Sequence, residues 1–141
     1  MPTTLLNVPH IRQRDRADCL PTCVEMVLSF LGRPIPRQRI HQILKPTPVG
    51  TPGFRLLRLG DCDYDVTYAA ATDERPLTEA LAAKLPPIAL LHTQNLPYWE
   101  RETAHAVVVI GMEAHTVYLN DPAFPDASQS VPREDFLLGL V

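Results

Sequence analysis

Cys19 is the residue of this chain with the strongest reason to be chemically reactive. It stands at the start of a segment in which apolar residues recur with helical spacing, at Val24, Val27, Leu28 and Leu31. The dipole of a helix and the free N–H groups of its first turn stabilise a thiolate at that position. The spacing therefore predicts a helix over residues 20–31, with a candidate nucleophile at its beginning.

The residues around this segment predict where the helix begins and ends. Asp18 is expected to be the N-cap, Pro21 is tolerated in the first turn, and Gly32 suits the position after the last turn. Cys23 lies one turn further in, on the side that carries Val27. We expect Cys23 to be an inert core residue.

A thiol nucleophile needs a histidine within reach, and five histidines compete for that role. His105 opens the apolar segment HAVVVIGM, and His92 ends the apolar segment IALLH in a comparable way. Position alone does not choose between these two. The other three lie in polar or loop settings and are expected to be solvated: His10, His41 and His115.

The partner of the histidine depends on the register of a predicted hairpin formed by residues 105–112 and 116–121. If its turn centres on Ala114, Asp121 opposes Val107 and lies diagonally next to His105. With a two-residue turn at Ala114 and His115, Asn120 takes that face instead. Either side chain can accept a hydrogen bond from an imidazole N–H, so the geometry leaves both open.

The remaining pattern predicts an α+β fold with helices first and antiparallel strands later. Strands are expected over residues 64–70, 88–92, 105–112 and 116–121. Further helices are expected over residues 36–44, over 52–60 with Thr51 as N-cap, and over 76–85. Residues 120–132 are expected to form a rigid loop, and residues 132–140 a closing helical turn.

Composition sets the broad class. The 141 residues are 45% hydrophobic and 21% charged, which predicts a single domain over residues 1–141. A net charge of -3 gives no reason to expect nucleic acid or an anionic membrane as the partner. Three cysteines do not make a disulfide framework, and neither a membrane-spanning run nor a secretory signal is present. We expect a cytoplasmic protein without membrane insertion.

Four sequence blocks together resemble one family. The segment VPHIRQRDRADCLPTCVEMVLSFLG is similar to the opening of the bacteriocin-processing cysteine peptidases, which are papain-like enzymes. These enzymes have a glutamine six residues before the cysteine, as Gln13 is here, and a helix that ends as Leu31-Gly32 does. HAVVVIG and NDP resemble the histidine and aspartate blocks of the family, in the same order. The resemblance covers Val8 to Pro122.

This resemblance implies a mechanism. Cys19 would be the nucleophile, His105 the general base and later the general acid, and Asp121 the residue that orients His105. This choice implies the three-residue connection in the hairpin. Gln13 would donate its side-chain amide to the oxyanion, beside the backbone N–H of Cys19. The implied fold is papain-like, with N-terminal helices packed on a C-terminal antiparallel sheet, and the implied chemistry cleaves a peptide or protein without metal or cofactor.

The chain departs from the family after the nucleophile, where Leu20 stands in place of glycine. The backbone N–H of the nucleophile can still donate to the oxyanion after this change. A leucine side chain would alter the subsites beside the cleavage point, which argues against a preference for double-glycine leaders. Tyr98 and Trp99, just ahead of His105, are further candidates for substrate contact. The sequence holds no transporter, so coupling to export would need a separate exporter or maturation partner.

Three alternatives remain at this stage. The same triad could perform transpeptidation or deamidation, because it does not decide whether water or an amine resolves the thioester. A catalytically silent peptide-binding module is a second alternative. The third is a zinc site formed by Cys19, Cys23 and Cys62 with a histidine, although CLPTC is not the usual knuckle spacing.

Overall fold

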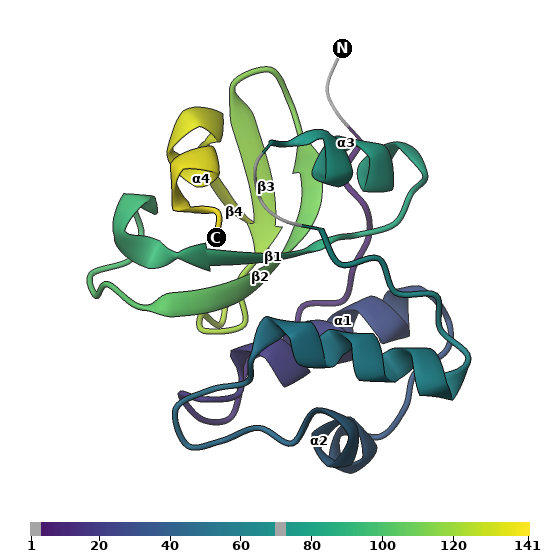
Figure 1. The fold of residues 1–141 in the computed structure, drawn as a ribbon. Coiled ribbons are helices and arrows are strands. Elements are labelled where there is room, and N and C mark those ends of the chain that lie inside the picture. The colour runs from purple at the N-terminus through teal and green to yellow at the C-terminus, as the bar shows by residue number, and fades with distance from the viewer. Residues whose placement is uncertain (1–3, 70–72) are drawn as a thin grey trace.

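The structure is a computed structural model that describes residues 4–69 and 73–141. Its helical half contains α1 (Cys19–Phe30), α2 (Arg37–Leu44) and the 3₁₀ helix η1 (Gly53–Cys62). Its other half is an antiparallel sheet in the order β1-β2-β3-β4, accompanied by α3 and α4 (Figure 1). The bounds of the latter elements are α3 (Arg75–Ala82), β1 (Ile88–His92), η2 (Thr93–Asn95), β2 (Ala104–Met112), β3 (Thr116–Asn120), β4 (Gln129–Pro132) and α4 (Arg133–Gly139). The predicted α+β fold is confirmed.

Helix α1 is built by local signals, as its sequence predicts. Apolar side chains on one face pack into a cluster with α2 and with one face of β2. The helix ends in a Schellman motif: Gly32 has a φ of +73°, and the N–H of Arg33 donates to the carbonyl of Leu28. Glycine adopts this left-handed conformation without steric cost, which fixes where the chain leaves the helix.

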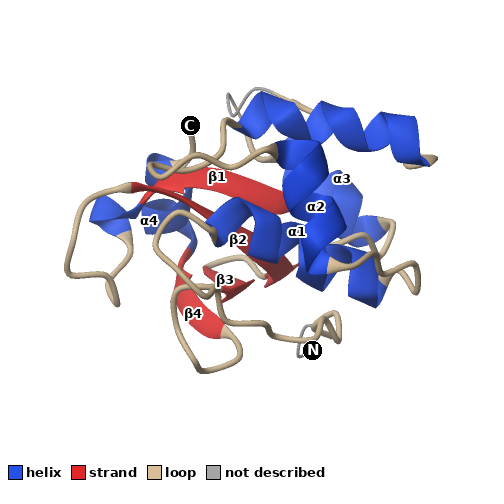
Figure 2. Cartoon of the chain, turned by 90° about the horizontal axis from the view of Figure 1, so that it is seen from below, coloured by secondary structure: helices blue, strands red, loops and turns tan. Residues whose placement is uncertain are grey.

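Strand β2 is buried on both faces, which explains its continuous apolar sequence. Ala106, Val108 and Ile110 face the cluster that contains α1. Val107 and Val109 face the opposite cluster, which contains α3 and α4. Seen from below, α1 and α2 therefore lie on one side of the strands and α4 on the other (Figure 2). This packing holds the first residues of β2 beside the beginning of α1.

The β2–β3 hairpin contains both registers that the sequence allows. Near the turn, Met112 pairs with Val117, and Ala114 and His115 form the tip. A β-bulge between Val109 and Gly111 then shifts the pairing, so that Val108 pairs with Asn120 at the other end. A bulge adds one residue to one strand, which changes the face of everything beyond it. The simple three-residue connection is therefore wrong, although Asp121 still lies opposite Val107.

Several predicted elements differ from the structure. Residues 64–69 form no strand, because Tyr64 and Val66 pack their side chains on the helical cluster and the backbone joins no ladder; Ala70 lies outside the described residues. The 3₁₀ helix η1 begins after Pro52, so Thr51 is not its N-cap. Strand β4 lies in the segment predicted as a loop. In the described part of the chain, no helix is long and apolar enough to cross a membrane.

Candidate active site

The imidazole of His105 lies between a carboxylate and a thiol. Its Nε2 is 2.6 Å from Oδ1 of Asp121. A hydrogen bond between His105 and the thiol of Cys19 contributes to the raised pKa of the imidazole. Since Nε2 serves Asp121, Nδ1 is the ring nitrogen left for the thiol. Cys19 comes from the first turn of α1, His105 from the start of β2, and Asp121 from the residue after β3. The structure thus brings together three of the four residues proposed from sequence for the catalytic centre.

Asp121 is fully buried and accepts four hydrogen bonds. Its Oδ1 accepts from His105 and from the backbone N–H of Ala123 at 2.9 Å. Its Oδ2 accepts from the hydroxyl of Tyr98 at 2.8 Å and from the indole N–H of Trp99 at 2.9 Å. Burial raises the pKa of this carboxyl, but the bonds from His105, Trp99 and Ala123 outweigh burial and hold the pKa below its usual value.

The same contacts favour a protonated His105. Burial lowers the pKa of the imidazole, since only 4% of its side chain is exposed. The hydrogen bonds to Asp121 and Cys19, together with the charges of these two residues, outweigh burial and raise the pKa to about 9. An imidazolium between a carboxylate and a thiolate is the arrangement that activates a cysteine nucleophile.

Cys23 is not a second nucleophile. It is fully buried, and burial, followed by the charges of Cys19 and Asp121, raises the pKa of its thiol. Its expected role as a core residue agrees with this position. Among residues 4–69 and 73–141, no three His, Cys, Asp or Glu side chains are grouped to hold a metal ion, so the zinc alternative has no support there.

Gln13 lies beside the site but points its amide at its own loop. Its Nε2 donates to the carbonyl of Asp15 at 2.9 Å and to that of Arg16 at 3.4 Å. Its backbone N–H donates to the carbonyl of Pro122, next to Asp121. Gln13 is therefore anchored to the chain that follows β3, on the side of the site where His105 lies.

Tyr98 and Trp99, which we expected to contact substrate, are bound to Asp121. The Trp99 ring packs edge-on against His105 with centroids 4.7 Å apart, and both aromatic residues pack against Phe124. These rings screen the bond between His105 and Asp121 from water. The sequence contains no signal for this contact, because more than twenty residues separate the aromatic pair from Asp121. Substrate contact by Tyr98 and Trp99 stays a prediction.

Asp18 does not cap helix α1, contrary to the sequence prediction. Its side chain is 2% exposed, makes no cap hydrogen bond, and forms an ion pair with Arg37 of α2. His41 of α2 lies 2.9 Å from the same carboxylate, so the expectation that His41 is solvated is also wrong. Asp18, the residue before Cys19, instead connects the start of α1 to α2. His10, also expected to be solvated, contacts the carbonyl of Phe124 at 2.7 Å.

A cleft of 910 Å³ runs from Cys19 and His105 across the molecule. Apolar side chains form much of its wall: Leu20, Val49, Tyr68, Leu90 and Val141. Leu20 is 1% exposed and packs into the core beneath the cleft, and its effect on substrate choice stays a prediction. His92, the rival histidine, is exposed at the end of β1 in this wall, away from Asp121.

Asn120, the other candidate partner for the histidine, points to the opposite face of β3. Its amide donates to the carbonyl of Val8 at 3.0 Å, and its Oδ1 accepts from the N–H of Ser128 at 3.2 Å. With the register set by the bulge in β2, Asp121 contacts the imidazole of His105 and Asn120 contacts the N-terminal segment.

A helix-borne cysteine facing a strand-borne histidine, with helices packed on an antiparallel sheet, is the architecture of the papain-like cysteine peptidases. The comparison with protein families agrees. The model of the peptidase C39 family matches residues 7–138, so the chain belongs to this family of cysteine peptidases. The resemblance noted in the sequence is therefore confirmed. No match was found among curated protein sequences.

Solved structures of low sequence identity share the fold. A protein from Bacillus anthracis described as a C39-like peptidase superposes with a TM-score of 0.80 at 18% identity, over 99% of this chain and 92% of that one. The peptidase domain of Streptococcus ComA, a bifunctional ABC transporter involved in quorum sensing, gives 0.75 at 17% identity over 96% and 93%. A double-glycine motif protease from an AMS/PCAT transporter, in complex with a leader peptide, gives 0.58 at 17% over 97% and 88%.

Proposed function

We propose that this peptidase cleaves a leader or tail from a peptide or protein substrate by a Cys-His-Asp mechanism. Cys19 attacks the carbonyl carbon, His105 gives its proton to the leaving amine, and water then hydrolyses the thioester with His105 as base. Asp121 holds the imidazole in place throughout. The observation that supports this most directly is the bridging position of His105 between Cys19 and Asp121.

Gln13 is proposed as an oxyanion donor together with the backbone N–H of Cys19. Its side-chain amide donates to the carbonyls of Asp15 and Arg16 in its own loop. The bond to Arg16, at 3.4 Å, is the weaker of the two and is the one that a developing oxyanion would replace.

The proposed setting is the cytoplasm, with a separate exporter or maturation protein as partner. Three free cysteines suit a reducing compartment. Two of the similar structures are peptidases from transporters, and one of these holds a leader peptide. A double-glycine preference is not part of the proposed function, because Leu20 follows Cys19 where the family has glycine.

The first experiment measures iodoacetamide alkylation of each cysteine against pH by peptide mass spectrometry. In the wild-type protein, Cys19 alone should react fast, because an adjacent imidazolium favours the thiolate. His105→Ala should abolish this fast reaction, and His92→Ala, which changes the other histidine of the cleft, should retain it. A Cys19 that reacts no faster than Cys62 contradicts the peptidase mechanism and favours a peptide-binding module.

The second measurement is the mass of the products from a cleaved peptide. Hydrolysis adds one water to the acyl fragment. Transfer to an added amine, with no free acid formed, would instead show transpeptidation on the same triad.

A further inference from the structure

A second cavity of 260 Å³ meets the cleft at the candidate active site. Gln13, Trp99 and His105 are among its lining residues. The charged side chains of its lining are Arg12, Arg14, Arg16, Arg101 and one acid, Asp15. We call this cavity the basic pocket.

The lining of the basic pocket carries a net positive charge, from four arginines against Asp15. In the part of the chain that the structure describes, none of the four guanidinium groups forms a hydrogen bond or an ion pair, although Arg14 acts electrostatically on Glu25 and His41. Asp15 uses its Oδ1 to accept the N–H of Ala17. Other arginines of the chain do pair with carboxylates, as Arg37, Arg75 and Arg133 show. Arg33, Arg39, Arg55 and Arg58 donate hydrogen bonds to oxygen atoms. Within the described residues, the guanidinium groups without a partner are therefore those of the basic pocket.

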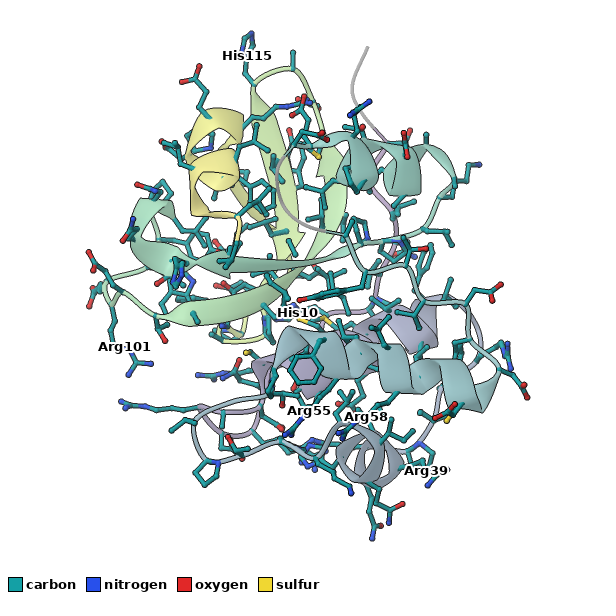
Figure 3. All side chains as sticks on the ribbon, viewed as in Figure 1. His10, Arg39, Arg55, Arg58, Arg101 and His115 are labelled. Carbon is teal, nitrogen blue, oxygen red and sulfur yellow. The ribbon has the colours of Figure 1, made fainter. Side chains whose placement is uncertain are left out.

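The arginines reach the basic pocket from two separate segments. Arg12, Arg14 and Arg16 come from the loop before α1, and Arg101 comes from the connection between η2 and β2. Figure 3 shows Arg101 extending from the sheet towards the helical half. Its sequence neighbours, Glu100 and Glu102, do not line the pocket. A peptide in the pocket would meet positive charge from both sides.

The chemistry of the reaction indicates which half of a substrate enters each cavity. The acyl carbon bonds to Sγ of Cys19, so the acyl half extends into the cleft that Cys19 lines. The leaving nitrogen receives its proton from His105. His105 lines both cavities. The basic pocket contains Gln13 but not Cys19, so we assign it to the leaving half.

We infer that the basic pocket selects substrates with an acidic side chain within the first few residues after the scissile bond. This inference rests on the proposed peptidase function and adds the chemical class of substrate that the leaving side accepts. Arginine suits carboxylate recognition because its planar guanidinium donates two parallel hydrogen bonds. Because the four side chains are exposed, we expect a preference of about two- to fivefold in kcat/KM over a neutral residue, weakening with salt.

The test uses a proteome-derived peptide library digested with the wild-type protein and analysed by mass spectrometry. The inference predicts enrichment of Asp and Glu after the cleavage site. A pair of quenched peptides from one cleaved sequence, with Asp or Ser at the enriched position, then gives the ratio of kcat/KM. Raising the salt concentration should reduce this ratio.

Charge-reversal variants assign the preference to the pocket. Arg101→Glu and Arg12→Glu should each reduce the Asp-to-Ser ratio, and together they should favour Lys. Arg39→Glu makes the same charge change on α2, away from the basic pocket (Figure 3), and should leave the ratio unchanged. A library cut without acidic enrichment, or an enrichment that survives both reversals, contradicts this inference alone. A library that stays uncut contradicts the proposed function and with it this inference.

Discussion

Two buried aspartates lie on either side of Cys19, and each contacts a histidine. Asp121 lies 2.6 Å from His105, and Asp18 lies 2.9 Å from His41. Yet the contacts of the first pair raise the pKa of His105 to about 9, whereas the pKa of His41 is lowered, first by burial and then by Arg37. At His105 burial is outweighed by the hydrogen bonds with Asp121 and then Cys19, whereas at His41 burial prevails and the guanidinium of Arg37 adds to it.

This contrast shows that contact between an aspartate and a histidine does not by itself make a catalytic pair. Arg37 already balances the charge of Asp18, so a second positive charge on His41 gains little. Asp121 receives only neutral donors besides His105, so its full charge is available to an imidazolium. The first pair suits proton transfer and the second suits anchoring α1 to α2.

The largest expected difference is between the two histidines. His105→Ala should lower kcat/KM by about 10⁴- to 10⁶-fold, because the variant has neither base nor acid. His41→Ala should change kcat/KM by less than about tenfold, since His41 touches no reacting atom. Steady-state cleavage of a peptide from the library measures both. Comparable losses would mean that the pairs do not differ in the way proposed.

The aspartates should separate next. Asp121→Asn should lower kcat by about 10³- to 10⁴-fold. In either orientation of the side-chain amide that this substitution introduces, its NH₂ group faces two hydrogen-bond donors. The indole N–H of Trp99 can only donate, so it cannot accept a hydrogen bond from this group. Asp18→Asn should reduce the free energy of unfolding by about 2 kcal/mol, by weakening the contacts to Arg37, and leave kcat nearly unchanged. Denaturant titrations and kinetics on both variants test this, and a large kcat loss in Asp18→Asn would contradict it.

A substitution of Gln13, in the loop before α1, should have a smaller effect on kcat. Gln13→Ala should lower kcat by about 10²- to 10³-fold, the cost of one oxyanion donor. KM should change little, because the donor acts on charge that develops in the transition state. The matched control is Gln42→Ala on α2, where Arg39 is its only recorded partner within the described residues. An unchanged kcat in Gln13→Ala would assign Gln13 to its loop alone.

The expected effect of pH on stability is smaller than the effects on catalysis of removing His105 or Asp121. The pKa of His105 rises from 6.5 to about 9 on folding, so the stabilisation is complete below pH 6.5 and lost as pH rises through 9. Relative to His105→Gln, the wild-type protein should lose at most about 3 kcal/mol over that window. The pKa of His41 is lowered on folding, which is the opposite direction. The difference in the free energy of unfolding between the wild-type protein and His41→Gln should therefore not fall as pH rises. Urea titrations at several pH values check this, and parallel curves for both variants would contradict it.

The local parts of the molecule were predictable from sequence. Helix α1 follows from apolar spacing and a terminal glycine, both of which act within a few residues. The apolar run IALLH matches β1 to the residue. The order of Cys19, His105 and Asp121 was also recognisable, because the family blocks are short and contiguous.

The parts that depend on distant partners were not predictable. Residues 64–69 have strand-like composition, but a strand exists only where an edge is available for pairing. The bulge at Ile110 also involves a distant partner, because the carbonyl of Ile110 accepts a hydrogen bond from the N–H of Leu6 in the N-terminal segment. A pattern within the hairpin sequence does not predict this contact. The side chain of Asp18 could equally cap α1, and Arg37, many residues away, decides otherwise.

The tie between the N-terminal segment and the chain after β3 has a consequence for biosynthesis. Gln13 is held by Pro122 and His10 by Phe124, a contact across 114 positions. A ribosome makes Cys19 and Gln13 early and the carboxylate of Asp121 about 100 residues later, or roughly 5–20 s at usual elongation rates. The thiol of Cys19 therefore emerges from the ribosome without His105 and Asp121. On the proposed mechanism, a nascent chain has no activated thiol until translation has passed Asp121.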